Sequence, residues 1–202
     1  MRMKGKGILL FVPVLLSLIM AGRGALAGDT IDPGMKAPEF NLKDVEGKDH
    51  TLADFQENKF VVVMFIATQC PVSNAYNERM VKLYSDYASR EVAFVGINSN
   101  KQEGVSEIKE HAAEHGFKFT ILKDPENVVA DAYDAKVTPE VFVIGADGTV
   151  RYHGRIDDNK DGSEVTSQDL RAALDALLAG KEPARAATKA FGCTIKRVKK
   201  DS

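Results

Sequence analysis

The chain has only two cysteines, Cys70 and Cys193, among its 202 residues. Cys70 lies in the stretch ATQCPVSNAY, directly after an apolar run and directly before Pro71. Because proline is well suited to the first turn of a helix, Cys70 is expected at a strand-to-helix junction. Unpaired backbone N–H groups at a helix start stabilise the reactive thiolate and lower the thiol pKa from about 8.5. We therefore predict that Cys70 is a reactive thiol with a depressed pKa.

The elements that must position Cys70 alternate between strand-like and helix-like patterns. Three runs rich in β-branched and aromatic residues are typical of buried strands, at residues 59–67, 92–98 and 117–122. After Pro71 the apolar period changes to that of a helix. Its buried stripe is expected to be Tyr76, Met80, Leu83, Tyr84 and Tyr87. Further helices are predicted over residues 105–115, 128–133 and 166–179, the last with a capping box of Thr166 and Asp169.

Two hairpins complete the pattern. Residues 37–55 predict an N-terminal hairpin with its turn near Glu46-Gly47, and Ala146–Gly148 predicts a second hairpin turn. Alternating strands and helices followed by an antiparallel hairpin predict an α/β fold, with a central mixed sheet and helices on both faces. Residues 28–180 are long enough to form this as one domain with its own core.

The first 27 residues have the pattern of a cleavable signal peptide. A basic start is followed by an apolar stretch too short to span a bilayer and by the small residues Ala25–Ala27. We therefore expect residues 1–27 to be removed and the mature protein to be periplasmic or secreted, with no stable membrane anchor. Residues 181–202 form a basic tail that carries Cys193.

Charge and composition limit the possible partners. The first 27 residues hold four basic and no acidic residues, so residues 28–202 have 23 basic and 29 acidic residues and a net charge of −6. This balance gives no support to nucleic-acid binding. His111 and His115 have zinc-ligand spacing and residues 157–162 resemble the start of a calcium loop, but neither pattern is complete. We expect no metal and no cofactor.

A second motif, Thr138-Pro139, stands immediately before a predicted strand. Together with Cys70 and the order of the elements, it resembles the thioredoxin-like superfamily over about residues 35–180. The opening PGMKAPEFNLKDVEGKDHTLADF is similar to the redoxin, or AhpC/TSA, branch, which includes peroxiredoxin-like and TlpA/ResA-like proteins. The resemblance implies a thioredoxin-like fold. It also implies that Pro139 is cis and lies beside the catalytic cysteine, and that the Thr138 backbone contacts a substrate peptide.

The chain departs from the motifs of that superfamily at two positions. Ser73 stands where thioredoxins and TlpA-like proteins carry the second cysteine of Cys-x-x-Cys. Ala67 stands where peroxiredoxins carry a peroxide-binding threonine, and Thr68 is one residue closer to Cys70. A disulfide within the motif is therefore excluded, and Thr68 is the candidate substrate-binding hydroxyl. The peroxiredoxin arginine could correspond to Arg79, Arg151 or Arg155.

Cys193 has three possible roles. It could resolve an oxidised or disulfide-bonded Cys70, and similar GC-x-IK tails occur in the redoxin-domain proteins that this chain resembles. It could instead form a permanent disulfide with Cys70, which the chain-entropy model values at roughly 4–5 kcal/mol for so long a loop. It could also remain unpaired or bond to another molecule.

The predicted function is that of an exported thiol-dependent oxidoreductase. Cys70 would attack a protein disulfide or a peroxide, Cys193 would resolve the intermediate, and Thr138, Pro139 and Thr68 would contact the substrate. A separate thiol reductant is implied as a partner. The alternative is a binding module on the same fold, such as a Sco-like copper chaperone, in which copper would recruit Cys193 and His153 beside Cys70.

Overall fold

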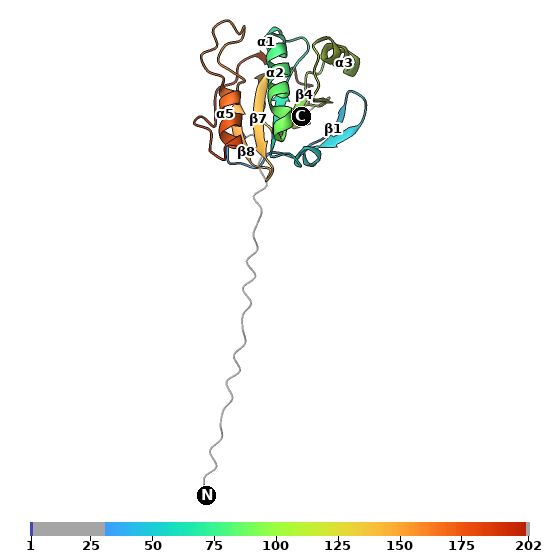
Figure 1. Cartoon of the computed structure of the whole chain (residues 1–202). Coiled ribbons are helices and arrows are strands. Elements are labelled where there is room, and N and C mark those ends of the chain that lie inside the picture. Colours follow the sequence, from blue (N-terminus) through green and yellow to red (C-terminus); the bar gives the residue numbers. More distant parts are fainter. Residues whose placement is uncertain (2–30, 201–202) are drawn as a thin grey trace.

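The computed structural model describes residue 1 and residues 31–200 (Figure 1). Its strands are β1 (Asn41–Asp44), β2 (Asp49–Thr51), β3 (Phe60–Phe65), β4 (Val92–Asn98), β5 (Thr120–Lys123), β6 (Val137–Thr138), β7 (Glu140–Gly145), β8 (Val150–Gly154) and β9 (Cys193–Thr194). Seven of them form one sheet in the order β2-β1-β5-β4-β3-β7-β8, and β6 pairs with β9. β4 runs parallel to both β3 and β5, whereas the other pairs are antiparallel. The predicted mixed sheet is confirmed.

Helices cover both faces of the sheet, as predicted. They are α1 (Pro71–Ala75), α2 (Asn77–Tyr87), α3 (Val105–Glu114), α4 (Val128–Ala132) and α5 (Asp169–Leu178), with short 3₁₀ turns at Leu52–Phe55 and Ala88–Arg90. α2 and α5 lie side by side over one face (Figure 1). Alternate side chains of β3 point to opposite faces, so Val62 packs in the cluster that contains α2 and α5, and Val63 in the cluster that contains α4.

Both predicted hairpins form at the expected turns. Gly47 closes the β1–β2 turn with φ +86°, and Gly148 closes the β7–β8 turn with φ +74°. Glycine adopts such backbone angles without the steric cost that other residues have. The N-terminal hairpin extends the sheet through the antiparallel pairing of β1 with β5.

Three features differ from the sequence prediction by more than a residue or two at a boundary. The helix after Pro71 is divided at Tyr76, which ends α1 and precedes α2. β5 begins at Thr120 rather than at Phe117. The predicted capping box of α5 is wrong, because the Thr166 hydroxyl donates to Asp158 and Asp169 binds Arg155 instead. The helix therefore begins at Asp169.

The C-terminal tail packs against the domain. Ile195 is only 3% exposed and belongs to the same apolar cluster as α4. The predicted signal peptide, residues 1–27, lies outside the described residues apart from Met1. No helix within residues 31–200 is long and apolar enough to cross a membrane.

Candidate functional site

Cys70 lies where the buried strand β3 gives way to the first helical turn. It is the residue that caps α1, with Pro71 as the first helical residue. The backbone N–H of Ser73 donates to Cys70 Sγ at 3.2 Å. A donor aimed at the sulfur favours the thiolate, because the charged form accepts the stronger hydrogen bond. Cys70 is only 3% exposed in this structure.

Cys70 and Cys193 form a disulfide, with their Cα atoms 5.9 Å apart and 123 residues between them in sequence. β9, which carries Cys193, pairs antiparallel with β6, and Cys193 lies directly opposite Thr138. The Thr138 carbonyl oxygen lies 3.4 Å from Cys70 Sγ, and the Thr138–Pro139 peptide bond is cis. The structure thus brings together four of the five predicted site residues, Cys70, Cys193, Thr138 and Pro139.

Ser73, at the position of the missing second cysteine, has a structural contact of its own. Its side chain is fully buried, and its hydroxyl accepts the backbone N–H of Ala67 at 3.1 Å. This bond joins the first helical turn to the loop that leaves β3. The hydroxyl therefore helps to hold the Cys70 loop in place.

Glu103 is a site residue that the sequence analysis missed. It is 1% exposed, and its carboxylate accepts the backbone N–H groups of Thr68 and Gln69 at 2.8 and 3.1 Å. The side-chain amides of Asn98 and Asn100 also donate to it. Four donors compensate the cost of burying the carboxylate. Glu103 thus fixes the two residues that precede Cys70.

The fifth predicted residue, Thr68, directs its hydroxyl toward α3. The hydroxyl donates to Glu107, and the hydrogen bond from Thr68 lowers the pKa of that carboxyl group. The Thr68 backbone carbonyl accepts the side-chain amide of Asn74 at 2.8 Å. The backbone N–H, the hydroxyl and the carbonyl oxygen of Thr68 are thus bound by Glu103, Glu107 and Asn74.

The tail beyond Cys193 is held by side chains that accept its backbone N–H groups. Asn100 Oδ1 accepts from Lys196 N, and Asn127 Oδ1 accepts from Val198 N, both at 2.7 Å. Arg197 donates to Asp131 at 2.7 Å. Because Asn100 also donates to Glu103, one buried network connects the loop before Cys70 with the strand that carries Cys193.

His153, the histidine considered for copper, is bound within the chain. Its Nε2 lies 2.7 Å from Glu140 Oε1, and its ring stacks on Phe142. The other oxygen of Glu140 accepts the backbone N–H groups of Lys136 and Val137 at 2.8 and 3.1 Å. Within residues 31–200, no group of three or more His, Cys, Asp or Glu side chains could hold a metal ion.

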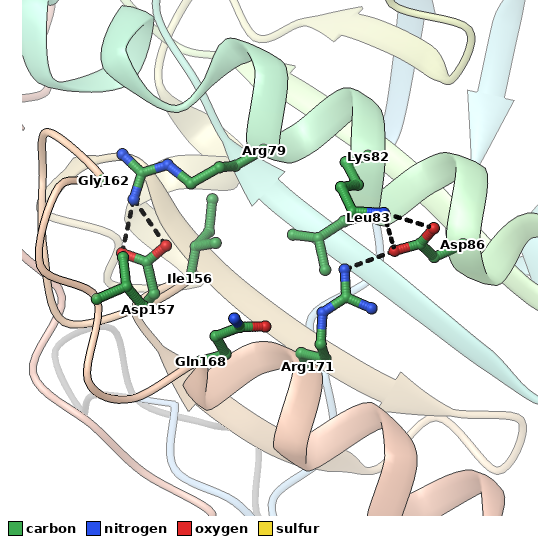
Figure 2. Close-up of a pocket in the computed structure, with 10 residues that line it drawn as sticks. Arg79, Lys82, Leu83, Asp86, Ile156, Asp157, Gly162, Gln168 and Arg171 are labelled. Carbon is green, nitrogen blue, oxygen red and sulfur yellow. Dashed lines mark hydrogen bonds and ion pairs between the residues drawn. The ribbon is translucent and has the colours of Figure 1, made fainter.

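A pocket of about 350 Å³ lies away from the cysteines, between α2, α5 and the loop after β8 (Figure 2). Arg79 binds both carboxylate oxygens of Asp157 at 2.7 and 2.8 Å. Lys82 and Arg171 both bind Asp86. The charged side chains of the pocket are therefore paired with one another, and neither cysteine lines it.

None of the three arginines considered for the peroxiredoxin position is directed at Cys70. Arg79 binds Asp157, Arg151 binds Asp147, and Arg155 binds Asp169 at 2.7 Å. Each guanidinium binds a carboxylate rather than either cysteine. The donor at Cys70 Sγ is instead the backbone N–H of Ser73.

Comparison with known proteins agrees with this geometry. The AhpC/TSA family profile matches residues 33–153. Over 146 residues the chain is 30% identical to thiol-disulfide oxidoreductase ResA of Bacillus subtilis, covering 71% of this chain and 79% of that protein. A hypothetical protein from Sinorhizobium meliloti superimposes with a TM-score of 0.79 at 36% identity, covering 84% of this chain and 97% of that one.

The fold is also found in a thioredoxin domain. That domain, from a thiol-disulfide oxidoreductase of Bacteroides vulgatus, superimposes with a TM-score of 0.54 at 19% identity. It covers 60% of this chain and 86% of the domain. The predicted thioredoxin-like fold is confirmed.

Proposed function

This chain belongs to the AhpC/TSA family, and we propose that it is an exported thiol-disulfide oxidoreductase in which Cys70 and Cys193 form the redox couple. The predicted resemblance to the redoxin branch is confirmed by the family match and by the similarity to ResA. The observation that carries the proposal is the Cys70–Cys193 disulfide at the end of β3.

The proposed reaction begins with the reduced chain. The Cys70 thiolate attacks one sulfur of a client disulfide, a Cys70–client disulfide forms, and the other client sulfur leaves as a thiolate that takes up a proton. Cys193, as a thiolate, then attacks Cys70 Sγ. The Cys70–Cys193 disulfide forms, and the client is released as a dithiol. The client gains two electrons and two protons, which an external thiol reductant restores to the enzyme.

The surroundings of Cys70 favour a disulfide over a peroxide as the substrate. The Thr68 hydroxyl is engaged with Glu107, and Ala67 has no hydroxyl. The three candidate arginines bind carboxylates elsewhere. Activation of a peroxide needs donors and positive charge aimed at its oxygens, and these residues do not supply them.

The roles assigned to the site residues are part of the proposal. Cys70 is the nucleophile and Cys193 the resolving thiol, and the edge formed by Thr138 and Pro139 faces the client. Thr68 acts through the loop that it fixes. A copper site is disfavoured because Glu140 already binds His153, and both thiols are consumed in the disulfide.

Export is proposed from the sequence of residues 1–27, which has the pattern of a signal peptide. Residues 28–180 would then form the redox domain, and residues 181–202 the tail that supplies the resolving cysteine. An oxidising compartment is one in which a disulfide between two distant cysteines persists between turnovers.

Turnover by three full-length proteins tests the proposal. The wild type, Cys70→Ser and Cys193→Ser are compared in the dithiothreitol-driven reduction of a disulfide-bonded client protein and in the consumption of hydrogen peroxide. We expect only the wild type to turn over the disulfide efficiently, and Cys193→Ser to accumulate a Cys70–client adduct visible by mass spectrometry. A wild type no faster than Cys70→Ser with the client would contradict the proposal, and efficient turnover of peroxide alone would assign the site to peroxide reduction.

A further inference from the structure

The segment around Cys193 is bound to the domain as an extended peptide. β9 pairs antiparallel with β6, and within residues 31–200 β6 pairs with no other strand. The ladder continues beyond the strand, because Ile195 N donates to the carbonyl oxygen of Lys136 at 3.0 Å. Addition of a strand to a sheet edge is a general mode by which proteins bind extended peptides. Residues 136–138 therefore form a peptide-binding edge, which we call the β6 edge, and the chain's own tail fills it.

Gly192, directly before the cysteine, is the position at which the β6 edge is most restrictive. A Cβ atom at residue 192 would lie 1.9 Å from the carbonyl oxygen of Thr138 and 2.6 Å from its carbonyl carbon. Both are backbone atoms, so no side-chain rotation relieves the contact. The same carbonyl oxygen lies 3.4 Å from Cys70 Sγ. A segment that follows the backbone path of the tail along this edge therefore collides with the Thr138 carbonyl group unless glycine precedes its cysteine.

Ile195, two residues after the cysteine, is the second position of the tail that fits closely against the domain. Its side chain is 3% exposed and packs in the apolar cluster that includes Tyr133 and Ala135. Thr194, between the two, is exposed, as expected for alternate residues of a strand. Burial of the aliphatic side chain is favourable, and a smaller side chain there would bury less apolar surface and leave a cavity.

We propose that the β6 edge, along which the proposed function already places the client, selects its client by sequence. It accepts an extended polypeptide in which glycine precedes the reactive cysteine and an aliphatic residue follows it by two positions. This inference rests on the proposed function, because the client must react with Cys70. The Cys70 thiolate attacks the sulfur of the client cysteine, the Cys70–client bond forms, the client disulfide breaks, and its second sulfur leaves as a thiolate.

The tail and the client cannot occupy the β6 edge together. The tail must leave residues 136–138 before the client binds, and its return displaces the client strand. Contacts farther along the tail keep Cys193 close during this exchange, notably those of Asn127 with Val198 and of Asp131 with Arg197. Closure of the Cys70–Cys193 disulfide and departure of the client are thus coupled.

The test uses full-length, reduced Cys193→Ser protein, in which Cys70 is the only thiol. Synthetic peptides with the sequence of residues 190–197 carry their cysteine as a mixed disulfide with thionitrobenzoate. Release of thionitrobenzoate measures the rate of attack by Cys70. The parent peptide is compared with Gly192→Ala and Ile195→Ala peptides, and the small disulfide dithionitrobenzoate reports the intrinsic reactivity of Cys70.

We expect the parent peptide to react at least about tenfold faster than each variant peptide, a factor equivalent to about 1.4 kcal/mol. Adding Gly192→Ala to the protein itself should raise the rate with the parent peptide, because the tail then no longer fits the edge. Gly104→Ala is the matched control, since a Cβ there meets nothing within 4 Å.

Two results would overturn the inference in different ways. If either variant peptide reacts as fast as the parent while dithionitrobenzoate also reacts, the edge does not select its client and the proposed function stands. If neither dithionitrobenzoate nor any peptide reacts with Cys70, both the inference and the proposed function fail.

Discussion

The cysteine region and the α2–α5 pocket use polar side chains in opposite ways. The pocket is an open cavity of about 350 Å³ whose charged groups, such as Arg79 and Asp157, bind one another (Figure 2). Near the cysteines, Glu103 instead accepts backbone N–H groups of the loop before Cys70. Asn100 accepts a backbone N–H group of the tail that carries Cys193. Neither cysteine lines that pocket.

The difference shows that shape alone is a poor guide to the site in this protein. A thiol-exchange site needs a thiolate, a stabilising donor and a second sulfur within reach. Reduction of the Cys70–Cys193 disulfide would supply all three, because Ser73 N–H and Cys193 both lie at Cys70 Sγ. The pocket has charge but no thiol, and its ion pairs join α2 to α5 and to the loop after β8.

The largest expected effect is confined to the cysteine region. Cys70→Ser should reduce client turnover by more than about 100-fold, because a serine hydroxyl is a far weaker nucleophile than the thiolate it replaces. Arg171→Gln, in the pocket, should change turnover by less than about twofold, because Arg171 contacts Asp86 and neither cysteine. The measurement is dithiothreitol-driven reduction of a disulfide-bonded client. A loss of turnover in Arg171→Gln comparable to that in Cys70→Ser would give the pocket a part in the chemistry.

Glu103→Gln and Asp157→Asn sharpen the comparison, since each neutralises one buried carboxylate. Each should lower the free energy of unfolding by about 2–3 kcal/mol, because buried donors lose a charged acceptor. Only Glu103→Gln should also slow closure of the Cys70–Cys193 disulfide, by about 10- to 100-fold, because it misplaces the loop before Cys70.

Urea unfolding and the rate of disulfide closure after addition of an oxidant separate the two effects. Asp157→Asn serves as the control for general destabilisation, because its carboxylate binds Arg79 and Tyr76 rather than either cysteine segment. Equal closure rates in the two variants would remove the positioning role assigned to Glu103.

The smallest expected effect concerns the outer anchor of the tail. Partial burial would raise the pKa of Asp131, but the hydrogen bonds from Lys200 and Arg197 outweigh it and hold the pKa below its ordinary value of 3.8. The ionised Asp131 carboxylate therefore stabilises the docked tail fully when the pH is above 3.8, the ordinary pKa. This contribution is lost as the pH falls through the depressed pKa of the docked state. The contribution should be about 0.5 kcal/mol, as for other partly exposed ion pairs.

Hydrogen exchange at the Val198 amide, in reduced protein, measures this contribution between pH 7 and pH 3 after correction for intrinsic rates. Protection should fall toward pH 3 in the wild type and change less in Asp131→Asn. An identical pH response in both proteins would show that the Asp131 contacts do not hold the tail.

The fold and the position of Cys70 follow from local sequence patterns, whereas the rest of the candidate site does not. The runs at residues 59–67 and 92–98 are long and almost entirely apolar, so β3 and β4 could be predicted. The position of Cys70 between β3 and the first helical turn could be predicted with them. The only signal for the buried network was the polar run Asn98–Asn100, which begins at the last residue of β4. Polar residues at the carboxyl end of parallel strands commonly form sites, and that signal could have directed attention there.

The remaining features depend on contacts between residues far apart in the sequence. Glu103 contacts Thr68 across 35 residues, and Asn100 contacts Lys196 across 96. Nothing in the local pattern of the basic tail shows that Ile195 is buried or that Gly192 lies against Thr138. Such pairings are fixed by tertiary packing, so they emerge only when the chain is folded.

The most direct test of the account is a redox titration of the Cys70–Cys193 disulfide in the full-length protein. The protein is equilibrated in thiol buffers of graded potential and alkylated under denaturing conditions, and the two cysteine peptides are quantified by mass spectrometry. We predict that Cys70 and Cys193 become alkylated together, at one midpoint above about −300 mV, the range of catalytic rather than structural disulfides. A disulfide that remains intact well below that potential would contradict the account, because Cys193 would then be a structural partner of Cys70 and not its resolving thiol.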